Sequence, residues 1–141
     1  MNEGLIIAII IGISIASVPL IFAAIGELVV ERSGVLNLGV EGMMIVGALS
    51  GFVVEFHTGS SLLAVLAALL AGMAIASIFA FLTQILLTNH VATGLALTLF
   101  GLGIAAFIGR GYSEENIKLI SEIHIPFLSD LPIVGPLLFG Y

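Results

Sequence analysis

Residues 61–87 read SLLAVLAALLAGMAIASIFAFLTQILL, and this stretch decides the fold because it carries no charged side chain. A helix of roughly 20 apolar residues spans the hydrocarbon core of a bilayer, which is about 30 Å thick. The run is apolar all round, whereas a strand of a membrane β-barrel alternates apolar and polar residues. Backbone groups in lipid must find hydrogen-bond partners within their own segment. The stretch is therefore predicted to be a transmembrane helix.

Three other apolar runs have similar length and composition, at residues 5–25, 35–56 and 91–108. A polar stretch follows at 109–130, and residues 131–141 are apolar again. We expect an all-α, polytopic transmembrane helix bundle with about four complete helices and the start of a fifth. Residues 1–141 are expected to form a single transmembrane domain.

The composition agrees with this fold. Hydrophobic residues make up 60% of the chain and charged residues 9%, whereas a soluble domain carries about 25% charged residues. The mean hydropathy is +1.32. A soluble catalytic domain is excluded, because too little polar surface is present to coat one. A net charge of −6 argues against nucleic acid and anionic lipid as partners.

Several kinds of chemistry are also excluded. The sequence contains no cysteine, which rules out disulfides, thiolate metal sites and thiol nucleophiles. His57, His90 and His124 lie far apart without paired ligands, so no metal site is expected. No Gly-x-x-x-x-Gly-Lys sequence occurs, so ATP would have to bind to another chain. We expect no catalytic residue and no cofactor in this chain.

Small residues recur every four positions within the apolar runs. Small side chains spaced in this way let two helix backbones approach closely, so they are predicted to form helix–helix contacts. In residues 61–87 the stripe includes Ala64, Ala68, Gly72, Ala76 and Ala80, and the same spacing relates Gly47 to Gly51 and Gly101 to Ala105 and Gly109. Pro19, inside the first run, is expected to kink its helix.

The densest group of polar residues is ELVVERSGVLNLGVEG, at residues 27–42. Its Glu41 lies inside an apolar run, where a charged acid costs about 2.5–3.5 kcal/mol. Two interpretations remain open: a structural hydrogen bond to a neighbouring helix, or a position lining a permeation path. Gly34, Gly39 and Gly42 favour tight turns and a break before the second helix, whose free amides could hold a polar group.

The charged residues at the start of this group are expected to shape the loop. Glu27 and Glu31 lie four apart and would repel each other on one helix face. One of them is therefore expected to find Arg32 or a backbone amide. Glu31 and Arg32 are expected to form an interfacial pair.

A second polar cluster, at residues 88–94, joins the third and fourth apolar runs. The connection is short, so a tight hairpin or a re-entrant turn is predicted. Asn89 offers two donors and an acceptor, and a solvated role is favoured over proton transfer for His90. Gln84 and Thr98 are expected to hydrogen bond across helices.

The runs FAAIGE at 22–27 and ERSGVLNLGVEGMM at 31–44 resemble the permease subunits of bacterial ABC importers. That superfamily includes branched-chain amino acid and ribose permeases, and the resemblance is to its nucleoside or simple-sugar branch. TNHVATGLAL at 88–97 is similar to a second signature of the branch, in which the family has glutamine at the position of His90. IPFLSDLPIVGP at 125–136 resembles the loop before the next helix.

The resemblance implies a transport subunit rather than an enzyme, in the cell (inner) membrane of a prokaryote with several passes. Its partners would be a second permease subunit, cytoplasmic ATPase subunits that hold ATP and magnesium, and an extracytoplasmic substrate-binding lipoprotein. Permeases of this family are longer, so the chain is interpreted as their N-terminal part. Arg110 and Lys118 weakly favour a cytoplasmic N-terminus.

Under this interpretation Asn37, Glu41 and Asn89 are expected near the substrate path. The residues expected to fix the loop geometry are Glu27, Glu31, Arg32, Gly34, Gly39 and Gly42. Two alternatives are a proton- or cation-coupled secondary transporter that uses Glu41, and a structural fragment that does not transport. No pattern in the sequence names the substrate.

Overall fold

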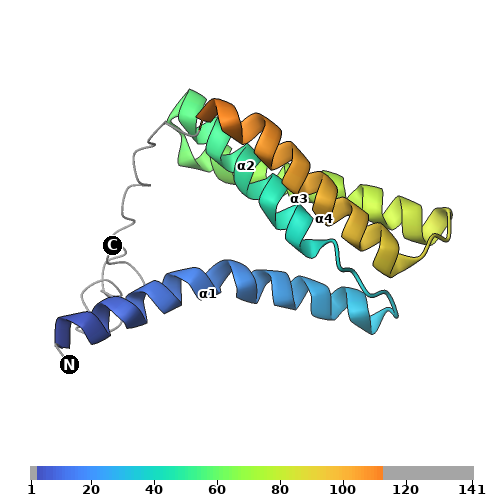
Figure 1. Ribbon diagram of the computed structural model, residues 1–141, viewed down its shortest axis with the longest axis horizontal. Helices are drawn as coiled ribbons and strands as arrows, with labels where there is room; N and C mark the ends of the chain where they lie inside the picture. Colours follow the sequence, from blue (N-terminus) through green and yellow to red (C-terminus); the bar gives the residue numbers. More distant parts are fainter. Residues whose placement is uncertain (1–2, 113–141) are drawn as a thin grey trace. The chain divides into compact units, whose positions relative to one another are not determined.

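The computed structural model describes residues 3–112, and every regular element in that range is helical. Figure 1 shows the helices in chain order. Their bounds are α1 Glu3–Arg32, α2 Val40–Thr58, α3 Ser61–Ala80, the π-helical turn η1 Phe81–Ile85, α4 His90–Gly109 and the 3₁₀ turn η2 Arg110–Tyr112. Among the described residues, four helices are long and apolar enough to cross a membrane, which confirms the predicted fold class. The expected start of a fifth helix, at 131–141, lies outside the described residues.

The described chain falls into two compact units, residues 3–25 and residues 26–112, and each is considered by itself. The single transmembrane domain stays a prediction. The first unit contains most of α1, with Pro19 in its interior. Proline has no N–H and therefore removes one hydrogen bond from the helix.

Helix α1 runs beyond the predicted end at residue 25 and continues to Arg32. The residues between are mostly good helix formers, such as Glu27 and Leu28. Ser33 and Gly34 follow the end of the helix, and the hydroxyl of Ser33 donates to the carbonyl of Val30 at 2.6 Å. Gly34 has a φ of +83°, a backbone conformation that favours glycine.

Helix α2 begins at Val40, five positions later than the sequence predicts. Residues 33–39 are non-helical, in agreement with the predicted break. The side chain of Asn37 gives the physical reason: its Oδ1 accepts the backbone N–H of Gly39 at 2.9 Å. This local bond offers the backbone an alternative to the helical ladder.

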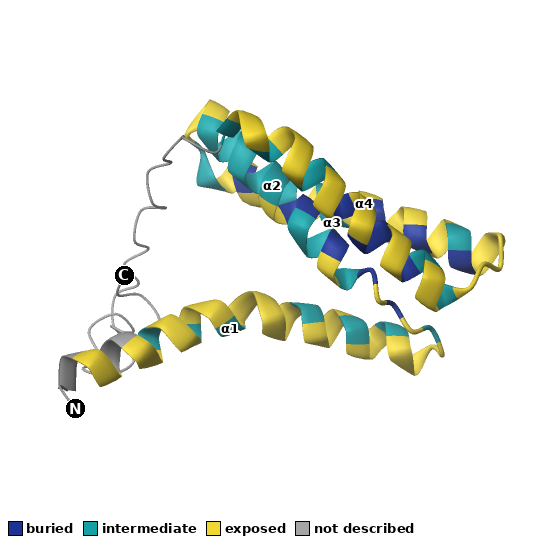
Figure 2. Cartoon of the chain, in the orientation of Figure 1, coloured by how far each residue is buried: buried dark blue, intermediate teal, exposed yellow. Residues whose placement is uncertain are grey.

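In the second unit, α2 is the central helix and contacts both α3 and α4, whereas α3 and α4 share few contacts (Figure 1). The buried core lies between the three helices and consists of Val46, Ile75, Phe79 and Leu97. Figure 2 shows the buried positions of these helices in dark blue and their exposed positions in yellow. The exposed side chains are largely apolar, as expected for helices surrounded by lipid.

Small residues form the contact between α2 and α3. A methyl group added at Gly47 would lie 3.2 Å from the carbonyl oxygen of Ala68, and one added at Gly51 would lie 3.3 Å from the carbonyl oxygen of Ala64. Gly72 is less crowded, since its nearest such neighbour is the carbonyl oxygen of Met43 at 4.0 Å. Of the remaining stripe positions, Ala76, Ala105 and Gly109 are half-buried and Ala80 is exposed.

The contact between α2 and α4 is closer still. A methyl group at Gly42 would lie 2.6 Å from the carbonyl oxygen of Leu97, and one at Gly101 would lie 2.9 Å from the Cα of Gly42. These neighbours are backbone atoms, which cannot rotate away. The two helices therefore cross at a point where only glycine fits without a backbone shift.

A matched pair of substitutions on α4 tests this crossing. We expect Gly101→Ala to destabilise the bundle by about 1–3 kcal/mol, because the added methyl group overpacks against the backbone of Gly42. Gly103, two residues further on, has nothing within 4 Å of an added methyl group. Gly103→Ala should be neutral or stabilise the helix by up to about 1 kcal/mol. Thermal unfolding in detergent micelles measures both, and equal melting temperatures for the two variants would contradict the crossing.

Candidate functional site

The loop at residues 33–39 is attached to the end of α1 by Glu27. The Oε1 atom of Glu27 accepts the backbone N–H of Asn37 at 2.8 Å. Asn37 is only 6% exposed, and its Nδ2 lies 3.8 Å from the sulfur of Met43. Together with the bond from Gly39 to Oδ1, these contacts use the backbone N–H, the side-chain oxygen and the side-chain nitrogen of Asn37. In this structure Asn37 holds the loop.

The same loop is attached to α4 by Thr98, sixty positions later in the sequence than its partner. The hydroxyl of Thr98 donates to the carbonyl of Leu38 at 2.9 Å, so the expected bond across helices is made instead to the loop before α2. Gly94 allows the close approach, because a methyl group there would lie 2.8 Å from the nitrogens of both Leu38 and Gly39. The loop is thus fixed from two sides. The expected cross-helix bond of Gln84 is absent from residues 3–112, since its Nε2 bonds to the neighbouring Thr83 at 3.4 Å.

The charged residues around the loop differ in their surroundings. The second carboxylate oxygen of Glu27 is buried and has no hydrogen-bond partner among the residues described. Glu31 and Arg32 are exposed, and no ion pair joins them in the described part of the chain. Consecutive residues of a helix point in different directions, which accounts for the missing pair. Of the two acids, Glu27 is therefore the one that binds a backbone amide.

Glu41 lies in the first turn of α2, directly after the fixed loop. Its side chain is exposed, and the structure gives it no hydrogen bond or ion pair within residues 3–112. A negative charge is favourable near a helix N-terminus because of the helix dipole. Contact of this carboxylate with hydrocarbon would nevertheless be costly, so it must face water or protein in the membrane.

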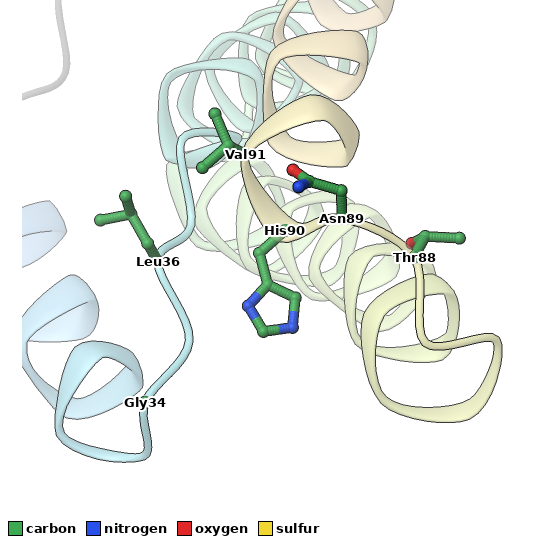
Figure 3. A pocket seen from close by; sticks show the side chains of 6 residues that line it. All are labelled: Gly34, Leu36, Thr88, Asn89, His90 and Val91. Atoms are coloured by element: carbon green, nitrogen blue, oxygen red, sulfur yellow. The ribbon is translucent and has the colours of Figure 1, made fainter.

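Asn89 forms the N-cap of α4. Its Oδ1 accepts the backbone N–H of Ala92 at 3.0 Å, as a side chain at this position commonly does. Asn89 also lines an open pocket of about 300 Å³, shown in Figure 3. The lining residues come from the loop after α1 and from the start of α4, and they are Gly34, Leu36, Thr88, Asn89, His90 and Val91.

The structure therefore brings together only part of the predicted path. The pocket joins the two polar clusters of the sequence through Gly34 and Asn89, whereas Asn37 and Glu41 do not line it. Roles of these residues along a path stay predictions. The sequence analysis did not predict that Gly94 lets the loop approach α4. The position of Gly94 in the second polar cluster could have indicated this role.

Two variants of Thr98 test how the loop is held. Thr98→Val keeps the shape of the side chain but removes the donor of the part-buried hydrogen bond to the carbonyl of Leu38, so we expect a loss of about 0.5–1.5 kcal/mol. Thr98→Ser keeps the hydroxyl and should recover most of that stability. Thermal unfolding of the chain in lipid nanodiscs measures the difference. A valine variant as stable as the serine variant would show that the bond does not hold the loop.

Comparisons with known proteins identify the family. The family described as "Branched-chain amino acid transport system / permease component" matches residues 9–133. A protein provisionally named as a glucose ABC transporter permease in Haloferax volcanii is 45% identical over 128 residues, which are 88% of this chain and 39% of that protein. No solved structure gives a significant match.

Two bacterial proteins are also similar. The nucleoside ABC transporter permease NupC of Lactococcus lactis is 32% identical over 135 residues, covering 89% of this chain and 43% of that protein. The guanosine ABC transporter permease NupQ of Bacillus subtilis is 32% identical over 133 residues, covering 86% and 42%. The chain spans about two fifths of the length of these relatives. The family resemblance inferred from the motifs is confirmed: this multi-pass membrane protein belongs to the permease-component family of branched-chain amino acid transport systems.

Proposed function

We propose that the chain forms the N-terminal part of the membrane pathway of an ATP-driven importer for nucleosides or related sugars. The observation that carries the proposal is the similarity of 86–89% of the chain to permeases named for nucleoside, guanosine and glucose transport. The four membrane-spanning helices supply the scaffold that such a pathway needs. Proton- or cation-coupled transport finds no support in these relatives, each of which is named as an ABC permease.

The complete transporter would combine this chain with other subunits. A second permease subunit would complete the pathway, and an extracytoplasmic binding protein would deliver the solute. ATP and magnesium would be bound by cytoplasmic ATPase subunits, so the chain is a transport subunit and not an enzyme. Binding of ATP would shift the populations of inward-open and outward-open states, provided that it favours one of them.

Within the chain, Glu41 is the residue that we place on the pathway. Its position in an apolar span, its exposure and its lack of a partner in the described residues all favour contact with water or a polar solute. The loop that precedes it is fixed by Glu27 and Thr98, so the carboxylate is presented from a rigid support. We assign Asn89 to the pathway as well, and the pocket that it lines supports this assignment.

Uptake measurements in the native host test the energy source. We expect a strain lacking this chain to lose accumulation of radiolabelled uridine, guanosine or glucose, and the intact chain to restore it. Accumulation should persist when an uncoupler collapses the proton gradient while ATP is maintained, and should stop with vanadate. Uptake that survives vanadate but stops with the uncoupler would refute ATP-driven import and support a secondary transporter.

Substitution of Glu41 tests the pathway itself. Glu41→Gln removes the charge with little change of shape. We expect uptake to fall about tenfold, because the variant loses one hydrogen bond between the solute and a charged group. Membrane insertion should be unchanged. Ser77→Ala is the control, because in the described part of the chain this exposed hydroxyl bonds only to the carbonyl of Met73 in its own helix. Full uptake by the glutamine variant would remove Glu41 from the pathway.

A further inference from the structure

The pocket in Figure 3 has two walls that are held in different ways. One wall, with Gly34 and Leu36, belongs to the loop fixed by Glu27 and Thr98. The other wall, at residues 88–91, follows directly after the irregular end of α3. The irregular segment determines where this second wall lies.

Helix α3 passes into the π-helical turn η1, in which the N–H of Leu86 bonds to the carbonyl of Phe81 at 3.2 Å. Thr83 lies inside this turn and is only 1% exposed. Its hydroxyl donates to the carbonyl of Phe79 at 2.8 Å. Turns of this kind are rare and often mark functional sites.

Leu87 follows the turn with a φ of +52°, the one non-glycine residue with positive φ among those described. This left-handed conformation is unfavourable for leucine, because its Cβ approaches the following carbonyl oxygen. The side chain is 82% exposed, so packing within the described chain offsets little of the cost. The conformation is held by Thr88, whose N–H and hydroxyl both donate to the carbonyl of Leu82, at 3.1 and 2.9 Å.

We propose that residues 86–89 form a gate that moves the second wall of the pocket. In the observed state Leu87 is left-handed and Thr88 bonds to Leu82. In the second state Leu87 adopts the right-handed conformation, the bonds of Thr88 to Leu82 break, and Thr88 and Asn89 move away from Leu36. The strain at Leu87 keeps the two states close in free energy, while the loop wall stays in place. This gate does not depend on which solute is transported.

Amide hydrogen exchange, measured by NMR on the chain in lipid nanodiscs, tests the gate. The reporter is the amide of Thr88, which must leave Leu82 in order to exchange. Leu87→Ala and Leu87→Gly both remove the exposed side chain, but glycine alone also removes the cost of positive φ. We expect the amide of Thr88 to exchange about fivefold more slowly in the glycine variant than in the alanine variant. The reason is that alanine, like any L-residue, is destabilised in the left-handed conformation, whereas glycine is not. Leu87→Asn, which also tolerates this conformation, should act in the same direction.

The amide of Gly39, on the fixed wall, is the control and should exchange equally in all variants. Equal protection of Thr88 in the glycine and alanine variants would overturn the proposal, as would weaker protection with glycine. A change of the same size at Gly39 would also overturn it, because the whole bundle would then respond. The measurement involves no uptake, so its failure leaves the proposed transport function standing.

Discussion

Buried backbone that is not helical must find hydrogen-bond partners elsewhere, and this constraint shapes the second unit of the chain. The loop at residues 33–39 meets it with a carboxylate from α1 at Asn37 and a hydroxyl from α4 at Leu38. Thr98 can reach because Gly94 lets the loop lie directly against the backbone of α4. The position of α2 then follows, since this helix begins immediately after the loop.

The same arrangement explains how a polar group is presented within an apolar protein. Glu41 lies in the first turn of α2 and directly precedes Gly42, where α2 crosses α4. Because that crossing leaves no space for an added methyl group, the backbone next to Glu41 is closely packed, while its carboxylate has no partner among the described residues. A polar group without a partner in residues 3–112 suits the proposed pathway, which a solute must both enter and leave. Elsewhere in this unit, the pocket joins a wall from the loop after α1 to a second wall that follows the left-handed Leu87.

Much of this fold can be predicted from the sequence, because apolar runs without charge have few alternatives in lipid. Spacing of four defines one helix face and so predicts that Gly47 and Ala68 each face another helix, but that these two meet is known only from the structure. Helix α2 begins at Val40, later than the apolar run at 35–56 predicts. Hydropathy does not register the turn formed by the side chain of Asn37. The attachment of Leu38 to Thr98 depends on how distant segments meet, which local patterns do not specify. Nor does composition reveal the left-handed Leu87, a position where glycine is the usual residue.

The central claim is that the loop before α2 is held by specific bonds to α1 and α4. Residue-resolved hydrogen exchange of the native chain in a lipid bilayer tests it most directly, because individual amides of one short loop are compared. Asn37 and Gly39 donate hydrogen bonds, whereas no bond from the amide of Leu36 is present within residues 3–112. The account predicts that Asn37 and Gly39 exchange as slowly as the interior of α2 while Leu36 exchanges rapidly. Uniformly rapid exchange across residues 33–39 would contradict it.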